Sequence, residues 1–273
     1  MKWEGNLRKM KAAVGVQGDV SYEFAGADGL QPIAGAGVNG LVGHDVTVTF
    51  CDEIRCVVSG DLISKTFGEG MSYQAFMESP LATPSILRPE LSRIHEGIAL
   101  RDEAWERKHH LQPHVVYLSW TSHVKVGVTR ATQVPTRWVD QGATGAMVVA
   151  HAPYRQLAGE MEVALKATFS DKTSWRAMLR EHVCDPAELE EAREEAFEAL
   201  GVGYESFFDD EEHVTCLTYP VAAYPVKVTS VKLDRTPKIS GRLAGVKGQY
   251  LIWEDGRVMN VRSHAGYRVR IEA

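Results

Sequence analysis

Apolar and polar residues alternate in several short stretches of the chain, and this period of two is typical of half-buried β-strands. Near the N-terminus it covers residues 20–24 and 45–50 (DVTVTF), which Gly-rich turns separate. It returns at residues 114–119 (HVVYLS) and 124–129 (VKVGVT), on either side of a short polar turn. We therefore expect a β-rich N-terminal part and a central β-hairpin.

A helical period replaces the alternation after the hairpin. Pro135 stands where the first turn of a helix accepts proline, and Gly142 stands where such a helix would end. Beyond a buried strand (AMVVA), residues 154–169 (YRQLAGEMEVALKATF) carry apolar side chains at helical spacing. Asp171 or Thr173 then caps a further helix around SWRAML. The central part is thus expected to be a small antiparallel sheet flanked by helices.

The last third of the chain begins with an acidic helix and continues as β structure. The stretch DPAELEEAREEAFEAL opens with Asp185 as a helix cap and Pro186 at the first helical position. From residue 214 onward the segments VTCLTY, VKVTSVKL, QYLIW and RVMNV are typical of strands. Asp255 and Gly256 join the last two in a predicted hairpin.

These patterns predict an α+β fold in four parts. Residues 1–113 form an N-terminal β-rich part and a proline-rich connector, and residues 114–182 hold the central sheet and its helices. Residues 183–212 hold the acidic helix, and residues 213–273 form a small β module. The length of 273 residues is enough for one large domain or two to three small ones.

Composition adds expectations about location. Hydrophobic residues make up 44% of the chain and charged residues 24%, which is ordinary for a globular protein. No apolar run resembles a signal peptide or approaches transmembrane length, so we expect no membrane partner. Four scattered cysteines without a CxxC pair predict free thiols and a cytoplasmic location; they are Cys51, Cys56, Cys184 and Cys216.

Charge is unevenly distributed along a chain whose net charge is −6. Residues 183–212 carry twelve acids against one arginine, whereas residues 213–273 carry ten Lys/Arg against four acids. Residues 115–182 carry eight Lys/Arg against five acids. The central and last parts could therefore present a basic face to DNA or RNA, or these charges could simply solvate a β surface.

Candidate chemistry falls in the central part. The hairpin would place Tyr117 and Lys125 side by side, and the following helix would add Arg137, which could form a reactive cluster. A tyrosine that only packs and an arginine that is only solvated would give the same pattern. Glu162 lies beside the apolar face of its helix, where it could bind a metal or could only pair with Lys166.

The segments KVGVTR, QVPTRWVDQGA, DKTSWR and GVKGQYLIW with VMNVR carry a family resemblance. Together they resemble the family filed as domain of unknown function 2797, which is grouped with the GIY-YIG nuclease superfamily. The resemblance runs from GNLRKMKA, at residues 5–12, to NVRSHAGYRV near the C-terminus. It implies a GIY-YIG-like antiparallel sheet within residues 114–182.

The resemblance also implies roles for individual residues. Tyr117 would be the tyrosine of the first motif, which helps to deprotonate the attacking water. Lys125 would stand in place of the second motif's tyrosine, and Gly127 would match its glycine. Arg137 would steady the scissile phosphate, and Glu162 would bind Mg²⁺ or Mn²⁺. The glycine and isoleucine of the first motif are missing, and protonated lysine cannot accept a hydrogen bond as a phenol does.

A nucleic-acid path is expected beside these residues. Arg130, Lys172 and Arg176 would contact the strand. Trp175 would stack on a base or else pack as a core residue.

Relatives in the resembled family carry CxxC pairs in the connector, and residues 51–110 look like a degenerate form of that zinc-ribbon-like region. Cys56 and Ser59 stand at the positions of the first CxxC pair, and Ser72 and Ala75 stand at those of the second. Serines occupy two further positions where cysteine is expected. Serine and alanine cannot replace thiolate ligands, so we expect no zinc. The nearby histidines could bind a metal or lie at the edge of the core; they are His109, His110 and His114.

Three functions remain open on these grounds. The first is a divalent-metal-dependent nuclease that hydrolyses phosphodiesters in DNA or RNA. The second is a nucleic-acid-binding module that keeps the fold without the chemistry. The third is a scaffold whose acidic helix recruits a basic protein partner.

Overall fold

The computed structural model describes residues 1–170, 172 and 174–273. It divides into two compact units: Met1–Met77 with Thr218–Ala273 form unit 1, and Glu78–Leu217 form unit 2. Helices and sheets occur together, so the predicted α+β class is confirmed. The segments expected as four parts are grouped differently, because the N-terminal and C-terminal β segments share unit 1.

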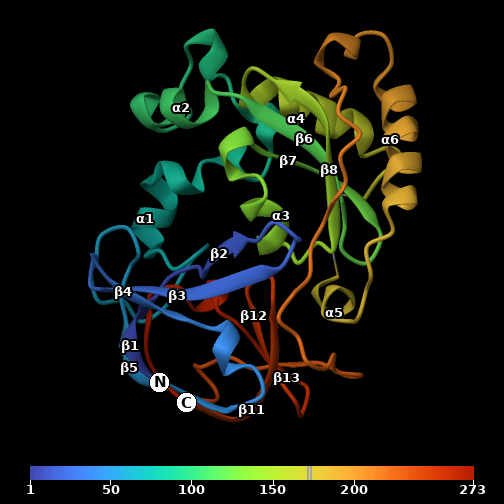
Figure 1. The fold of residues 1–273 in the computed structure, drawn as a ribbon. Coiled ribbons are helices and arrows are strands. Elements are labelled where there is room, and N and C mark those ends of the chain that lie inside the picture. Colours follow the sequence, from blue (N-terminus) through green and yellow to red (C-terminus); the bar gives the residue numbers. More distant parts are fainter. Residues whose placement is uncertain (171, 173) are drawn as a thin grey trace. The chain divides into compact units, whose positions relative to one another are not determined.

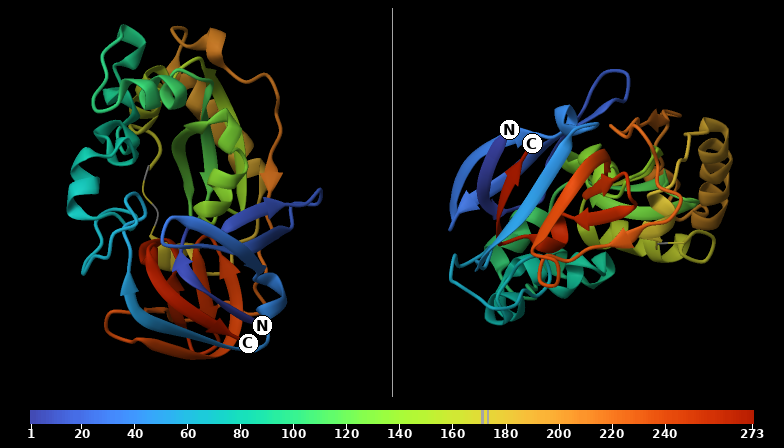
Figure 2. Two further views of the ribbon diagram at one scale, coloured as in Figure 1. Left: turned by 90° about the vertical axis from the view of Figure 1, so that its left-hand side faces the viewer. Right: turned by 90° about the horizontal axis from the view of Figure 1, so that it is seen from below.

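Unit 1 is built on a sheet to which ten described strands contribute, in the order β10-β13-β12-β11-β5-β14-β1-β3-β2, with β4 paired to β3. Strand β14 lies between β5 and β1 and is antiparallel to both. The chain ends therefore lie side by side (Figure 2). The strands are β1 (Lys2–Leu7), β2 (Lys11–Val14), β3 (Val20–Asp28), β4 (Gln31–Gly37), β5 (Asp45–Ile54), β10 (Thr229–Ser230), β11 (Lys238–Lys247), β12 (Tyr250–Trp253), β13 (Arg257–Asn260) and β14 (Tyr267–Glu272).

Ion pairs neutralise much of the basic charge of residues 213–273. Arg268 and Arg270 on β14 contact the carboxylate of Glu4 on β1 at 3.1 and 3.0 Å. Further pairs within unit 1 join Arg242 with Glu254, Arg257 with Asp255 and Arg262 with Glu69. The predicted basic module is thus a sheet whose arginines face acids from both ends of the chain.

Unit 2 contains a second sheet with the order β7-β6-β8-β9 (Figure 1). Apolar side chains of β6, β7 and β8 pack against α4 and α6 to form its core. The elements are α2 (Glu103–His110), β6 (His114–Trp120), β7 (Val124–Arg130), α3 (Thr136–Asp140), β8 (Gly145–Ala152), α4 (Arg155–Leu165), α5 (Trp175–Met178), α6 (Pro186–Leu200) and β9 (Thr215–Cys216). Among the described residues, no helix combines the length and the apolar character needed to cross a membrane.

Local signals in the sequence account for several element boundaries. The Asp185 carboxylate accepts a hydrogen bond from the Ala187 backbone N–H at the start of α6. Gly256, at φ +83°, makes the turn between the antiparallel strands β12 and β13. Both boundaries were predicted. The predicted cap residues Asp171 and Thr173 lie outside the described residues, and Ser174 caps α5.

Two predicted strands are much shorter than expected. The segments VTCLTY and VKVTSVKL contain only the two-residue strands β9 and β10. Prolines break the backbone hydrogen-bonding pattern between them, at Pro220 and Pro225. The intervening chain pairs with its sheet through an isolated bridge, Val221 with Gly245.

The connector consists of short turns of helix, in line with the absence of a long helical period. It holds α1 (Tyr73–Glu78) and the 3-10 turns η2 (Pro80–Ala82), η3 (Pro84–Ile86), η4 (Pro89–Leu91) and η5 (Ile94–Glu96) before α2. Turn η4 packs closely on α4, since a Cβ on Gly159 would lie 2.2 Å from the backbone nitrogen of Glu90. Glycine at this position therefore lets the connector contact the helix.

The acidic helix α6 is amphipathic rather than fully solvated. Leu189, Ala192, Ala196 and Leu200 are buried in the core of unit 2. The one arginine of the helix, Arg193, is also buried, and its guanidinium donates to the Asp209 carbonyl at 2.8 Å. The glutamates occupy the remaining, exposed face.

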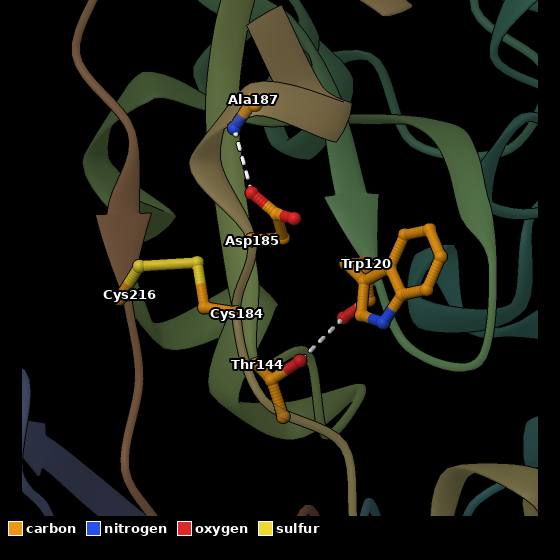
Figure 3. The surroundings of a disulfide bond; sticks show 6 residues. All are labelled: Trp120, Thr144, Cys184, Asp185, Ala187 and Cys216. Atoms are coloured by element: carbon orange, nitrogen blue, oxygen red, sulfur yellow. Dashed lines mark hydrogen bonds between the residues drawn. A yellow bond between two sulfur atoms is a disulfide. The ribbon is translucent and has the colours of Figure 1, made fainter.

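Cys184 and Cys216 form a disulfide, so the prediction of free thiols is wrong for these two residues. Figure 3 shows Cys184 in the segment before α6 and Cys216 on β9. Gly145 lies opposite Cys216 in the β8–β9 pairing, and a Cβ there would lie 2.6 Å from the Cys184 sulfur. The bond joins residues 32 positions apart, a separation that leaves no local pattern in the sequence. Cys51 and Cys56 are free.

Candidate functional site

Tyr117 lies at the centre of the candidate site on β6. Its side chain is fully buried, and it pairs directly with Gly127 across the β6–β7 hairpin. A Cβ on Gly127 would lie 2.5 Å from the Tyr117 hydroxyl oxygen. Glycine at residue 127 therefore makes room for the phenol, which crosses over the neighbouring strand.

The Tyr117 hydroxyl is held by polar groups from two other elements. It donates a hydrogen bond to Oε1 of Gln141, which follows α3, at 3.0 Å. Burial raises the pKa of Tyr117, the charge of Arg137 and a hydrogen bond with it oppose that rise, and the charge of Glu162 adds to it. The structure therefore brings together three of the four predicted catalytic residues around a phenol that is neutral near pH 7.

Lys125 is the fourth predicted catalytic residue, and it lies two residue pairs further along the hairpin. It pairs with Ser119, on the same sheet face as Tyr117 and Gly127. Lys125 therefore lies diagonally across the hairpin from Tyr117, and not directly beside it as expected. Lys125 is buried, with 4% of its surface exposed, and a bridge joins its backbone to Ser170. Its role in chemistry stays a prediction.

Helix α3 positions Arg137. Trp138 and Val139 on this short helix are buried, which leaves the preceding Arg137 half-exposed beside the sheet. The ring of Trp138 lies 6.1 Å from that of Tyr117, so the helix packs directly against the candidate site. Because Trp138 and Val139 are buried, helix α3 fixes the position of Arg137, whose guanidinium could bind an anionic ligand.

Glu162 comes from α4 and is nearly buried, with 8% of its surface exposed. Its carboxylate lies 3.3 Å from Nζ of Lys166 one turn later, the pair expected from the sequence. Among the described residues, no group of three or more His, Cys, Asp or Glu side chains could hold a metal. A single carboxylate still fits Mg²⁺, because this ion often takes one or two protein carboxylates and completes its shell with water and substrate phosphate.

Arg155, at the start of α4, is a further cation that the sequence did not single out. Its guanidinium donates to the carbonyls of Ser85 at 2.8 Å and Ile86 at 3.0 Å, both on turn η3. Burial lowers the pKa of Arg155 to about 10, Glu162 raises it, and Arg137 lowers it. Arg155 therefore remains charged near pH 7 and belongs to the same cluster.

The four residues predicted to contact nucleic acid fall in two places. Arg130 ends β7, half-exposed, and its Nη1 lies 2.8 Å from Nδ1 of His109. Lys172 is exposed. Trp175 and Arg176 begin α5, where the Arg176 guanidinium covers the Trp175 ring at 4.3 Å from its centroid. Trp175 is half-buried, so it is neither a pure core residue nor an open stacking surface.

Buried polar groups lie around the later positions at which the family resemblance implies cysteines. Ser92 Oγ lies 3.2 Å from Nδ1 of His110, and the Nδ1 of His114 lies 2.7 Å from the Gln112 carbonyl. Burial lowers the pKa of His110 to about 3 and of His114 to about 4. Both histidines are therefore neutral and buried, and Nε2 of each has no hydrogen-bond partner within the described part of the chain.

Of the four positions in the first two implied CxxC pairs, only residue 56 is a cysteine. Cys56 Sγ accepts hydrogen bonds from the backbone N–H groups of Ser59 at 3.5 Å and Ser72 at 3.2 Å. Burial opposes ionisation, but hydrogen bonds led by those from Ser59 outweigh it and lower the pKa of the Cys56 thiol to about 7. Three of the four positions in the first two implied CxxC pairs, residues 56, 59 and 72, thus meet at the Cys56 sulfur.

Sequence reasoning missed Gln141 and Arg155, and it named His109 only as a possible metal ligand or a residue at the edge of the core. Gln141 lies in the segment QVPTRWVDQGA, but its bond to Tyr117 joins residues 24 positions apart. Arg155 and His109 act through contacts with segments that are distant in sequence. Of the two missed residues, only Gln141 had a signal, because it belongs to a segment already singled out.

Comparisons with known proteins give one match. The model of a family described as protein of unknown function, DUF2797, matches residues 43–269. Neither the curated proteins nor the solved structures contain a match. The match covers most of both units and includes Tyr117, Arg137 and Glu162. The chain therefore belongs to the DUF2797 family.

Proposed function

We propose that unit 2 binds a nucleic-acid phosphodiester at the cluster of Tyr117, Arg137 and Glu162 and promotes its hydrolysis. The observation that carries this proposal is the buried Tyr117 hydroxyl, which shares its surroundings with one arginine and one carboxylate. Such a combination suits a phosphate whose charge grows during attack by water. The proposal includes a GIY-YIG-like identity for the β6–β7–β8 sheet.

Each side chain has a definable task in this proposal. Arg137 would hold two phosphate oxygens through its planar guanidinium. Tyr117 directs its hydrogen to Gln141 and accepts one from Arg137, so one lone pair of its oxygen is left to accept a hydrogen from the attacking water. Because its pKa is raised, Tyr117 would orient that water rather than remove a full proton at neutral pH.

Glu162 would hold Mg²⁺ or Mn²⁺, and when bound the ion would supply further positive charge to the phosphate. Lys166 pairs with the Glu162 carboxylate at 3.3 Å. The half-buried position of Arg155 next to this carboxylate adds a second cation to the cluster. Lys172, Trp175, Arg176 and Arg130 remain proposed contacts to the strand.

The test is cleavage of single-stranded, duplex and branched DNA and RNA with Mg²⁺ or Mn²⁺. Arg137→Ala should lower cleavage about 100-fold or more, as loss of a charge-stabilising donor does in other enzymes. Glu162→Gln should abolish cleavage and retain binding. Arg107→Ala is the matched control, because this exposed residue pairs with Glu103 on α2. Cleavage retained by Glu162→Gln would contradict the metal-ligand role.

A binding module without catalysis is the second candidate, and the raised pKa of Tyr117 favours it. Its mark would be wild-type binding that weakens steeply with salt, without cleavage in either metal. Arg137→Ala should then weaken binding, whereas Glu162→Gln should leave it unchanged or tighten it because a negative charge is removed.

A further inference from the structure

Arg130 and His109 form a polar pair outside the cluster around Tyr117. Nη1 of Arg130 donates to Nδ1 of His109 at 2.8 Å, so the imidazole is neutral and carries its hydrogen on Nε2. Burial and the charge of Arg130 lower the pKa of His109, which agrees with this form. The pair therefore offers the remaining guanidinium N–H groups and one imidazole N–H, and both residues are partly exposed.

Helix α2 holds the imidazole in place. The ring of Trp105 lies 4.3 Å from that of His109 on the next turn. The fully buried carboxylate of Glu106 accepts hydrogen bonds from the backbone N–H groups of Leu100 and Arg101, which anchors the start of the helix. A side chain fixed in this way can orient Arg130 at little further entropic cost.

The pair lies at the same end of the sheet as Arg155. His114 on β6 pairs with Arg130 on β7 and with Ala152 on β8, and Arg155 follows Ala152 by three residues. The positive charges of Arg137 and Arg130 both lower the pKa of Arg155. Arg155 is thus electrostatically coupled both to Arg137 in the Tyr117 cluster and to Arg130 at the end of β7.

We propose that Arg130 and His109 form a second phosphate-binding subsite, so that the ligand of unit 2 is a nucleic-acid strand presenting at least two successive phosphates. The inference rests on the proposed function, with Arg137 at the first phosphate. A mononucleotide or a small phosphodiester would fill the first subsite only. Contacts to phosphates position a strand without reading its sequence, so this subsite would set register and length rather than base preference.

Affinity for two ligands of different length tests the inference. A dinucleoside monophosphate, with one internucleotide phosphate, and a single-stranded octanucleotide of the same base would compete against a fluorescein-labelled oligonucleotide, followed by anisotropy without divalent metal. Arg130→Ala should raise the Kd of the octanucleotide about tenfold and change that of the dinucleotide less than twofold. Its salt slope, as log K against log salt, should fall by about 0.7.

His109 acts as a positioning residue, which a second pair of variants tests. His109→Ala should raise the octanucleotide Kd in the same direction as Arg130→Ala, and His109→Asn should restore it because the amide oxygen replaces Nδ1 as the acceptor. Arg107→Ala, an exposed arginine on the same helix, should leave both affinities unchanged.

The outcomes separate this inference from the proposed function. Binding that Arg137→Ala loses while Arg130→Ala leaves both ligands unaffected, or weakens both equally, would overturn the second subsite and keep the first. No binding of either ligand by the wild type would overturn both. Failure of His109→Asn to restore affinity would overturn the positioning role of His109.

Discussion

Reducing the Cys184–Cys216 disulfide should lower the free energy of unfolding of unit 2. The cross-link joins residues 32 positions apart, and a loop of that length loses about 12 cal/mol/K of chain entropy when it is closed in the unfolded state. This corresponds to about 3.7 kcal/mol at 25 °C. A unit the size of Glu78–Leu217 shifts its Tm by roughly 3 °C per kcal/mol, so a fall of about 11 °C is expected.

The assay is urea unfolding of the whole chain with and without reductant. Thiol titration in denaturant should find two reactive thiols, Cys51 and Cys56, before reduction and four afterwards. Cys184→Ala with Cys216→Ala is the internal control, because reductant should not change the stability of that double variant.

Two results would refute the reasoning. Four thiols without reductant would show that the bond does not form. Two thiols together with a stability change below about 1 kcal/mol would show that the segment from Cys184 to Cys216 stays ordered in the unfolded state, so that the chain-entropy argument does not apply.

Two further predictions follow from buried groups in unit 2. Gly127→Ala should cost about 1–3 kcal/mol of unfolding free energy, because its Cβ would lie 2.5 Å from the Tyr117 oxygen; Gly203→Ala, with no atom within 4 Å, should be near neutral in the same urea titration. His110 and His114 have folded pKa values of about 3 and about 4, below the unfolded value of 6.5, so the unfolded state binds more protons. Stability is therefore full above pH 6.5 and falls as the pH drops, by about 2 kcal/mol per histidine between pH 6.5 and pH 5. The His114→Asn variant should take up about one proton fewer on unfolding, so its unfolding free energy should change less steeply with pH. An unchanged slope would contradict burial of the neutral His114 ring.

The sequence predicted what adjacent residues determine. Asp185 and Pro186 define the start of α6, and Asp255 with Gly256 defines a hairpin, because each signal acts within a few residues. The hairpin at residues 114–130 was expected on the same grounds, and its register put Gly127 opposite Tyr117. These features depend only on local backbone geometry and side-chain periodicity.

Contacts between distant segments were beyond such signals. No periodicity links the segments that are joined by the disulfide, by the hydrogen bond from Arg130 to His109, or by the hydrogen bonds from Arg155 to turn η3. The predicted basic face was likewise incomplete, because Glu4 belongs to a strand that pairs with β14 only in the folded sheet. Charge along the sequence therefore did not translate into charge on one surface.

The position of β14 between β5 and β1 has a consequence for how the protein is made. A ribosome releases β1 and β5 long before β14, so the edge of each strand that pairs with β14 stays unpaired during most of synthesis. Unit 2 is continuous in the chain and can fold while β1 and β5 still have unpaired edges. Loss of β14 would delete the strand that joins β1 to β5. Residues 267–272 therefore decide whether β1 and β5 ever become part of one sheet.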